Sequence, residues 1–443
     1  MSTITKPGKA LAAAVTIATS LFFSACSGDP DSSATPDDTS APEATEIIFW
    51  SWLPDIQKTI DLFEVAHPDI HVTLENVGSG EDEYTKIQNA VDAGAGGPDV
   101  AQMTYEAIPN FSLTGALADL TKTGGAAVAD RFLPGVVELV SRDGGIYGVP
   151  QDFGPGVLYY RADVLEEAGI EVPATWDEFK AAAEKLKAHD PTKHITYLDP
   201  GLAAAAYMGL WQLQSDPWTA VSQTELEIDL NRPGSIQWAD YWSDLNARDL
   251  VIQSKMGSDE WFKQMGAGQI ATWLVGAWGL QALTGNLPDN AGLWRVAPQP
   301  VWTAGDKATS QFGGSATVVI DQSKKKAAAT TFALWLNSDP VAVESLKNDQ
   351  GLLPATTAAW ADDAFLDEEI AYLGGQPARQ IFAQSALDTA PGWEWLPFQP
   401  YVSSIYADTV GQEIAAKGSI AAGFQVWQER IIAYAKDQGF TVK

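Results

Sequence analysis

Early in the chain, two periodicities of apolar positions alternate, and they predict alternating strands and helices. Residues 47–50 form a continuous apolar run, which is typical of a strand buried on both faces. Apolar positions across 56–63 then recur at the spacing of one helix face. The same sequence of patterns repeats as an alternating segment at 70–74, a helical stripe at 87–91 and an apolar segment at 98–103. This order predicts a parallel sheet with right-handed crossovers, which binds ligands beyond the carboxyl ends of its strands.

The rest of the chain shows the same mixture of patterns, without an internal repeat. The run Thr175-Trp176-Asp177-Glu178 fits a capping box at the start of a helix. Residues 200–285 contain many tryptophans, and their pattern predicts a mostly helical region. Further strands are predicted at 157–160 and 314–320, and further helices at 163–168, 324–336 and 424–431. Together the patterns predict an α/β fold.

Composition limits the number of domains and the classes of partner. The chain has 443 residues, which is enough for two or three domains. Its net charge of −30 disfavours nucleic acids and anionic lipid headgroups as partners. The single cysteine excludes an internal disulfide and a four-cysteine metal site. Pro68 lies between His67 and His71 and prevents the helical spacing that a metal pair would need, so we expect no metal and no cofactor.

The first 25 residues have the three-part layout of a secretory signal peptide. A basic start is followed by an apolar run at 10–23, which is too short to span ~30 Å of hydrocarbon comfortably. Cys26 follows Phe23-Ser24-Ala25, and these four residues resemble the bacterial lipobox, whose usual leucine is here Phe23. The resemblance implies cleavage before Cys26 and lipidation of its thiol, and two or more acyl chains anchor a protein firmly. A plain signal peptide with an incidental cysteine is the alternative.

Residues 26–45 differ in composition from everything that follows them. They are rich in Ser, Thr, Pro, Asp and Ala, and most of them are too small or too polar to form a core. The composition predicts a flexible tether with a reach on the order of 25 Å. The expectation is a folded body held on a tether at the extracellular face of the cell membrane.

Several segments in a fixed order resemble the family-1 extracellular solute-binding proteins of ABC sugar importers, the family that includes maltose-binding protein. They lie at 49–70, 96–103, 147–169, 173–179, 265–279 and 312–338. The resemblance implies a two-lobed α/β fold with a hinge, in which sugar binds in the cleft between the lobes. It also implies ABC transporter permease subunits as partners and a monomeric binding protein without enzymatic activity.

The resemblance also implies that the chain passes between the two lobes three times. The crossings are expected near 150–157, 310–315 and 350–356, where glycine and proline are compatible with hinges or with ordinary turns. The N-terminal lobe is predicted to comprise 46–152 and 313–352, and the C-terminal lobe 153–312 and 353–443. Ligand contacts with both lobes would favour the closed state over the open one.

Sugars present apolar C–H faces that stack on aromatic rings, and hydroxyl groups that pair with carboxylates and amides. A sugar cleft should therefore combine these residue types at strand ends and in loops. For Trp278 and for the segment 393–395, the resemblance to the family adds to this argument. Packing in the core is the alternative for each tryptophan. The candidates are Trp50, Trp52, Tyr105, Glu106, Gln151, Asp152, Trp211, Trp278, Gly314, Trp393, Glu394 and Trp395.

Two other functions remain open from the sequence. A binding protein for another solute is one, and a polyamine would suit carboxylates beside aromatic rings. A secreted glycoside hydrolase is the other, and it would need two carboxylates about 5–9.5 Å apart. Glu106, Asp152 and Glu394 would be its candidates, although the chain carries no hydrolase motif. The sequence does not identify the sugar, its length or its linkage.

Overall fold

The computed structural model describes residues 44–222, 224–350 and 352–443. Residues Ala44–Lys443 form one compact unit. The predicted signal peptide, Cys26 and nearly all of the predicted tether lie outside the described residues. Thr45, which the sequence assigns to the end of the tether, is instead the first residue of a strand and pairs with Ile70.

The first sheet has five strands and confirms the predicted β-α-β-α-β order. Its strands are β2 (Ile70–Glu75), β1 (Thr45–Trp50), β3 (Val100–Thr104), β14 (Ser315–Val319) and β6 (Val149–Pro150), in that spatial order. Strand β1 runs parallel to β2 and β3, whereas β14 is antiparallel to both β3 and β6. The carboxyl ends of β1 and β3 therefore lie at one edge of this sheet.

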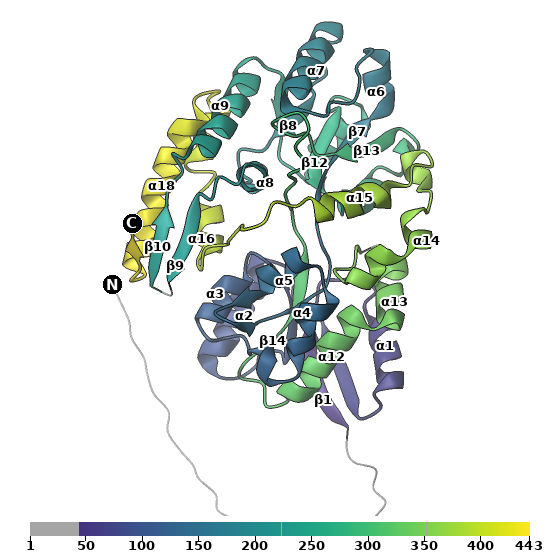
Figure 1. Cartoon of the computed structure of the whole chain (residues 1–443), viewed down its shortest axis with the longest axis vertical. Coiled ribbons are helices and arrows are strands. Elements are labelled where there is room, and N and C mark those ends of the chain that lie inside the picture. The colour runs from purple at the N-terminus through teal and green to yellow at the C-terminus, as the bar shows by residue number, and fades with distance from the viewer. Residues whose placement is uncertain (1–43, 223, 351) are drawn as a thin grey trace, which may run out of the picture. The chain divides into compact units, whose positions relative to one another are not determined.

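Three helices pack together against this sheet, as Figure 1 shows. They are α1 (Gln57–Ala66), α12 (Lys326–Ser338) and α13 (Pro340–Gln350). Phe332 of α12 meets Phe49 of β1 and Phe63 of α1 edge to face, with ring centroids 5.2 Å and 5.0 Å away. Edge-to-face aromatic pairs of this kind add to the stabilisation from burial.

The second sheet is antiparallel and belongs to a different part of the core. Its strands are β12 (Thr272–Gly276), β7 (Gly156–Arg161) and β13 (Trp294–Pro298). Strand β7 lies in the middle, and α15 (Ala378–Leu387) packs against β7 and β13. Trp261 and Trp273 pack edge to face beside this sheet, and both are buried.

The prediction of a mostly helical region at 200–285 is only partly right. Helices α8 (Ala204–Gln212), α9 (Pro233–Ala247), α10 (Asp259–Gly266) and α11 (Gly279–Asn286) are present. Between them lie four strands that the pattern did not predict: β9 (Trp218–Ser222), β10 (Glu225–Ile228), β11 (Val251–Gln253) and β12. Strand β11 pairs with β8 (Thr196–Leu198), and β10 pairs with β9 and β15 (Thr441–Val442).

The predicted capping box is confirmed at the start of α7 (Trp176–His189). The Glu178 amide donates to Thr175 Oγ1 at 3.2 Å, and Glu178 Oε2 accepts from the Thr175 amide at 3.2 Å. The last helix, α18 (Ile420–Asp437), also follows its predicted stripe and lies beside α9 (Figure 1).

Apart from α2, the remaining helices and strands are short. The helices are α2 (Glu81–Ala93), α3 (Ile108–Leu113), α4 (Val128–Arg131), α5 (Pro134–Val140), α6 (Ala162–Glu167), α14 (Asp363–Leu366), α16 (Gln399–Ser404) and α17 (Val410–Ala415). A small hairpin joins β4 (Ser141–Arg142) to β5 (Gly145–Ile146).

Three segments run between the two groups of elements: one joins β6 to β7, one joins β13 to β14, and one follows α13. The first of them pairs with the other two. We call them the crossing segments, and they comprise 152–156, 309–313 and 353–355. The Phe153 amide donates to the Leu353 carbonyl at 3.1 Å, and the Phe312 amide donates to the Gly154 carbonyl at 2.8 Å. They coincide with the three predicted crossings. The residue ranges assigned to each lobe stay a prediction.

Candidate functional site

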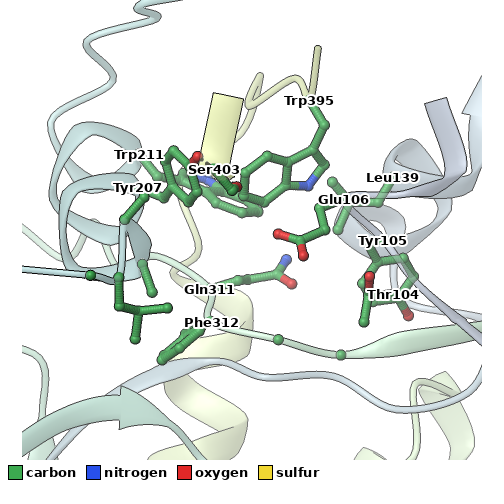
Figure 2. Close-up of a pocket in the computed structure, with 16 residues that line it drawn as sticks. Thr104, Tyr105, Glu106, Leu139, Tyr207, Trp211, Gln311, Phe312, Trp395 and Ser403 are labelled. Atoms are coloured by element: carbon green, nitrogen blue, oxygen red, sulfur yellow. Dashed lines mark hydrogen bonds between the residues drawn. The ribbon is translucent and has the colours of Figure 1, made fainter. Parts of the chain in front are cut away.

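A cavity of about 270 Å³ opens where the crossing segments meet the carboxyl end of β3 (Figure 2). We call it the main cavity. The first sheet contributes Thr104, Tyr105 and Glu106, and helix α5 contributes Leu139. Helix α8, the crossing segment 309–313 and the loop that carries Trp395 supply the other walls. The main cavity thus lies at the end of a parallel strand, where the strand order predicts a ligand site.

The residues after β3 are held in place by hydrogen bonds from neighbouring elements. Tyr84 Oη accepts from the Thr104 amide at 2.9 Å and pairs with Thr104 Oγ1 at 2.8 Å. Tyr105 donates its hydroxyl proton to the Asp152 carbonyl at 2.9 Å, and burial raises the pKa of the Tyr105 phenol. With these two residues fixed, the Glu106 carboxylate points into the main cavity (Figure 2).

Aromatic rings form the opposite wall. Tyr207 and Trp211 lie one turn apart on α8, and Trp395 meets both rings edge to face at centroid distances of 5.3 Å and 6.1 Å. Trp211 donates its indole N–H to the Ala390 carbonyl at 2.7 Å, and Tyr207 pairs with Ser403 Oγ at 2.9 Å. The polar atoms of Tyr207 and Trp211 thus have partners within the fold, and both side chains line the main cavity.

The side chain of Gln311 makes no hydrogen bond within the described part of the chain, and the indole N–H of Trp395 has no partner there either. Gln311 is 4% exposed, and neither its Nε2 nor its Oε1 has a partner among the described residues. Figure 2 shows the Gln311 carboxamide beside the Glu106 carboxylate at the main cavity. Leaving a buried amide unpaired costs about 1–3 kcal/mol. A bound ligand with hydroxyl groups would supply the missing donor and acceptor.

Two glycines allow the backbone to approach this site closely. Gly313 and Gly314 have φ angles of +84° and +94°, which side chains rarely permit. A Cβ at Gly314 would lie 2.8 Å from the Tyr105 ring, and one at Gly313 would lie 2.9 Å from the Trp278 Nε1. The two glycines therefore let the backbone pack closely against Tyr105 and Trp278, and contact of Gly314 with a ligand stays a prediction.

Among the described residues that line the main cavity, Glu106 is the only charged one. Neither lysine nor arginine is present there to balance an anionic ligand. A carboxylate, a carboxamide and aromatic rings can together bind a neutral ligand with apolar faces and hydroxyl groups. In the described part of the chain, no three histidine, cysteine, aspartate or glutamate side chains are grouped to hold a metal ion.

The structure brings part of the predicted site together in this cavity. Tyr105, Glu106, Trp211, Gly314 and Trp395 line it. Their ligand contacts stay predictions. Sequence reasoning missed Gln311 and Tyr207, although both had a recognisable signal. Gln311 is an amide next to Phe312 in a predicted crossing, and Tyr207 lies one helical turn before Trp211.

Predicted residues near β1 and the first crossing have other contacts. Trp50 is 6% exposed, and its indole N–H donates to Glu75 Oε2 at 2.8 Å on the neighbouring strand. Trp52 packs partly buried against the same core. Asp152 Oδ1 accepts from Ser315 Oγ at 2.6 Å, and Gln151 Oε1 also accepts from this hydroxyl. Gln151 and Asp152 thus hold the crossing in place, and none of these four residues lines the main cavity.

Three further candidates also lie outside the main cavity. Trp278 donates its indole N–H to the Phe312 carbonyl at 2.7 Å and supports a crossing segment. Trp393 stacks on Trp211 with ring centroids 5.2 Å apart and an interplanar angle of 5°. The exposed Glu394 accepts a hydrogen bond from the Ala220 amide at 2.8 Å. A ligand-binding role for these three residues stays a prediction.

These features define a class of protein: two α/β lobes that are joined by paired crossing segments, with a binding cavity at the junction. The sequence profile of the family described as bacterial extracellular solute-binding protein matches residues 50–343, which is more than half of the chain. The chain therefore belongs to the bacterial extracellular solute-binding proteins.

Curated relatives include sugar-binding proteins. The arabinooligosaccharide-binding protein of Halalkalibacterium halodurans is 26% identical over 344 residues, which cover 74% of this chain and 75% of the relative. The lactose-binding protein of Rhizobium radiobacter is 26% identical over 370 residues, which cover 78% of this chain and 83% of the relative. Both are named as binding proteins rather than as enzymes.

Solved structures agree with this assignment. The ABC transporter associated binding protein from B. animalis subsp. lactis, in complex with β-1,6-galactobiose, is 32% identical with a TM-score of 0.79. The alignment covers 90% of this chain and 100% of that one. The galacto-N-biose/lacto-N-biose I-binding protein of Bifidobacterium longum, in complex with lacto-N-biose, is 25% identical with a TM-score of 0.78 over 90% of this chain and 99% of that one. The predicted two-lobed fold is confirmed.

Proposed function

We propose that this protein is the extracellular receptor of an ABC importer and binds a neutral oligosaccharide in the main cavity. The observation that carries the proposal is the buried Gln311 carboxamide, which has no partner within the described part of the chain. Sugar hydroxyl groups both donate and accept hydrogen bonds, so they match both atoms of this amide. The ring faces of Trp211 and Trp395 would stack on the apolar sides of the sugar.

The chemistry of the walls supports a neutral ligand over an anionic one. Glu106 accepts hydrogen bonds from hydroxyl groups, and among the described lining residues there is no cation that would compensate a sugar phosphate or an acidic sugar. The sugars named for the relatives, galactobiose, lactose and arabinooligosaccharides, are neutral. A linear polyamine is the second candidate ligand because Glu106 lies beside aromatic rings.

Hydrolysis of the sugar is not part of the proposal. A glycosidase needs two carboxyl groups about 5–9.5 Å apart across the scissile bond. Among the described residues that line the main cavity, only Glu106 has a carboxyl group. The carboxylate of Asp152 accepts a hydrogen bond from Ser315, and that of Glu394 accepts one from the Ala220 amide. The sugar would therefore dissociate from the protein without having been cleaved.

Anchoring and delivery complete the proposal. Lipidation of Cys26 would hold the mature chain at the outer face of the membrane, and 27–44 would serve as its tether. Within the described residues, no helix has the length and apolarity needed to cross a bilayer. Ligand contacts with both lobes would favour a closed form, which the permease subunits would recognise.

Tryptophan fluorescence tests the binding function directly, since aromatic rings line the cavity. The mature chain from residue 26, with Cys26→Ser to keep it free of lipid, is titrated with di- to tetrasaccharides and with spermidine. We expect a saturable response to a neutral sugar series and intact sugar afterwards by chromatography. A response to spermidine alone would identify a polyamine receptor, and cleaved sugar would contradict the proposal.

A further inference from the structure

A second cavity of about 250 Å³ adjoins the main cavity on the side of α5. We call it the side cavity. Helix α5 lines one side of it, the segment 386–393 lines the other, and Phe153 from a crossing segment lines its base. Leu139, Trp211 and Gln311 line both cavities. The two cavities therefore meet at these three side chains.

The volume of the main cavity is small for a site that binds an oligosaccharide. Small-molecule sites in proteins usually have volumes of roughly 300–1,000 Å³. The main cavity, at about 270 Å³, lies below this range, whereas the two cavities taken together lie within it. A ligand that occupied only the main cavity would leave the side cavity to water.

The unpartnered amide lies at the boundary between the two cavities. Gln311 has one free acceptor and two free donor hydrogens, and a ligand in the main cavity alone would approach them from one side only. A chain of sugar units that passed Gln311 would offer hydroxyl groups to the amide from both cavities. The position of this side chain therefore favours a ligand that continues past it.

The side cavity also has the walls that a sugar unit requires. Trp393 lines it, is 7% exposed and has an indole N–H without a partner among the described residues. The indole N–H groups of Trp261 and Trp273 also have no partner among the described residues, and these two residues lie in the core. The unpaired N–H of Trp393 is relevant to ligand binding because Trp393 lines a cavity. Glu138 is the only charged residue among the described residues that line the side cavity, which again suits a neutral ligand.

We propose that the ligand runs from the main cavity past Gln311 into the side cavity, so that the preferred sugar is an oligosaccharide of three or more units. The inference rests on the proposed function and deepens it by specifying ligand length. Trp393 then contributes to the recognition of the additional unit, although it lies outside the main cavity.

Gly135 offers a way to fill the side cavity without straining the fold. It lies on α5, lines the side cavity, and a Cβ added to it would have no atom within 4 Å. Its φ lies outside the left-handed region, so a side chain is tolerated there. Gly135→Phe therefore adds bulk at the side cavity. Gly285 on α11 also has open space around it, which makes Gly285→Phe a matched control away from both cavities.

Isothermal titration calorimetry of the mature chain with Cys26→Ser measures the effect of ligand length. The probes are the di-, tri- and tetrasaccharides of the β-1,6-galactose series and of the arabinose series. In the bound series, we expect the trisaccharide to bind about tenfold more tightly than the disaccharide. Gly135→Phe should reduce that ratio to about one, and Gly285→Phe should leave it unchanged.

The outcomes separate this inference from the function on which it rests. Equal affinities for disaccharide and trisaccharide in the parent chain would overturn the inference and leave the receptor function standing. A length preference that survives in Gly135→Phe would also overturn it. If no sugar of any length binds, both the inference and the proposed function fail.

Discussion

Gln311 is the residue on which the proposed site depends most. Its carboxamide is buried without a partner in the described part of the chain, so Gln311→Leu removes no internal hydrogen bond. We expect the free energy of unfolding to stay unchanged or to rise by up to about 1–3 kcal/mol, because an apolar side chain replaces a buried amide without a partner. Sugar affinity should fall about ten- to hundredfold, because ligand hydroxyl groups lose their partner. Calorimetry and urea unfolding measure the two effects.

Gln376 provides the matched control for this substitution. Its carboxamide accepts from the Val296 amide at 2.9 Å and donates to the Val296 carbonyl at 2.7 Å, and Gln376 lines neither cavity. Gln376→Leu should lower the free energy of unfolding by about 1–3 kcal/mol and leave sugar affinity unchanged. Equal effects of the two substitutions on sugar affinity would show that Gln311 does not contribute to the binding site.

Glu83 predicts a pH dependence of stability. Burial raises the pKa of its carboxyl group to about 8, and the charge of Lys86 offsets part of this rise. The unfolded chain holds this carboxyl group near its ordinary pKa of 4.5, so the folded state binds more protons between these two values. The contribution of Glu83 to stability is therefore complete below about pH 4.5 and is lost as the pH rises toward 8.

Glu83→Gln tests this sign, because the amide is neutral at every pH. Urea unfolding at pH 8 should show the variant to be more stable than the parent by on the order of 2–4 kcal/mol. At pH 5 the difference should nearly vanish. A difference of the same size at both pH values would show that Glu83 does not titrate in this way.

At the residue scale, the sequence identified some of the residues that line the main cavity, because their signal is local. Tyr105 and Glu106 follow a strand whose carboxyl end could be recognised from its pattern, and they line the main cavity. Trp50 is the last residue of β1, but its indole N–H donates to Glu75 on β2. The sequence does not show which way a side chain turns at a strand end, because a partner far along the chain decides it.

At the scale of elements, the capping box of α7 should contribute measurably to stability. Thr175→Ala removes the acceptor of the Glu178 amide, and we expect the free energy of unfolding to fall by about 1 kcal/mol. Thr331→Ala, in the exposed middle of α12, serves as a control and should change stability little. Chemical denaturation measures the free energy of unfolding of both variants. An equal loss of stability in the two would contradict a special role for the capping box.

The crossing segments should tolerate little added volume. A Cβ at Gly154 would lie 2.3 Å from the Phe312 carbonyl oxygen of the neighbouring crossing segment. Gly154→Ala should therefore lower the free energy of unfolding by about 2 kcal/mol and weaken sugar binding. Gly285→Ala, with open space around its Cβ, should be neutral or slightly stabilising. A fully stable Gly154→Ala protein would show that the crossings are loosely packed.

Elements with strong local patterns were predicted correctly, whereas several short strands that depend on distant partners were missed. The first three strands and their helices carry clear periodicities. Strand β12 escaped prediction because its segment is short and lies between glycines, and it forms a strand by pairing with β7. Strand β9 was missed in the same way, because its strand conformation depends on pairing with β10.

At the scale of the whole molecule, charge and cavity chemistry agree. The chain has a net charge of −30, and neither lysine nor arginine lines the main cavity in the described part of the chain. Both features disfavour anionic ligands and leave neutral sugars as the class that fits best. The family was recognisable from segments spread over most of the chain. The side cavity was not, because α5 and the segment 386–393 come together only in the folded protein.

A crystal structure of the mature chain bound to its tightest-binding sugar tests the central claim most directly. The account predicts sugar density in the main cavity, with hydroxyl groups within hydrogen-bond distance of Glu106 and Gln311 and a ring face against Trp211 or Trp395. Sugar bound elsewhere, with Gln311 still without a partner, would contradict the account.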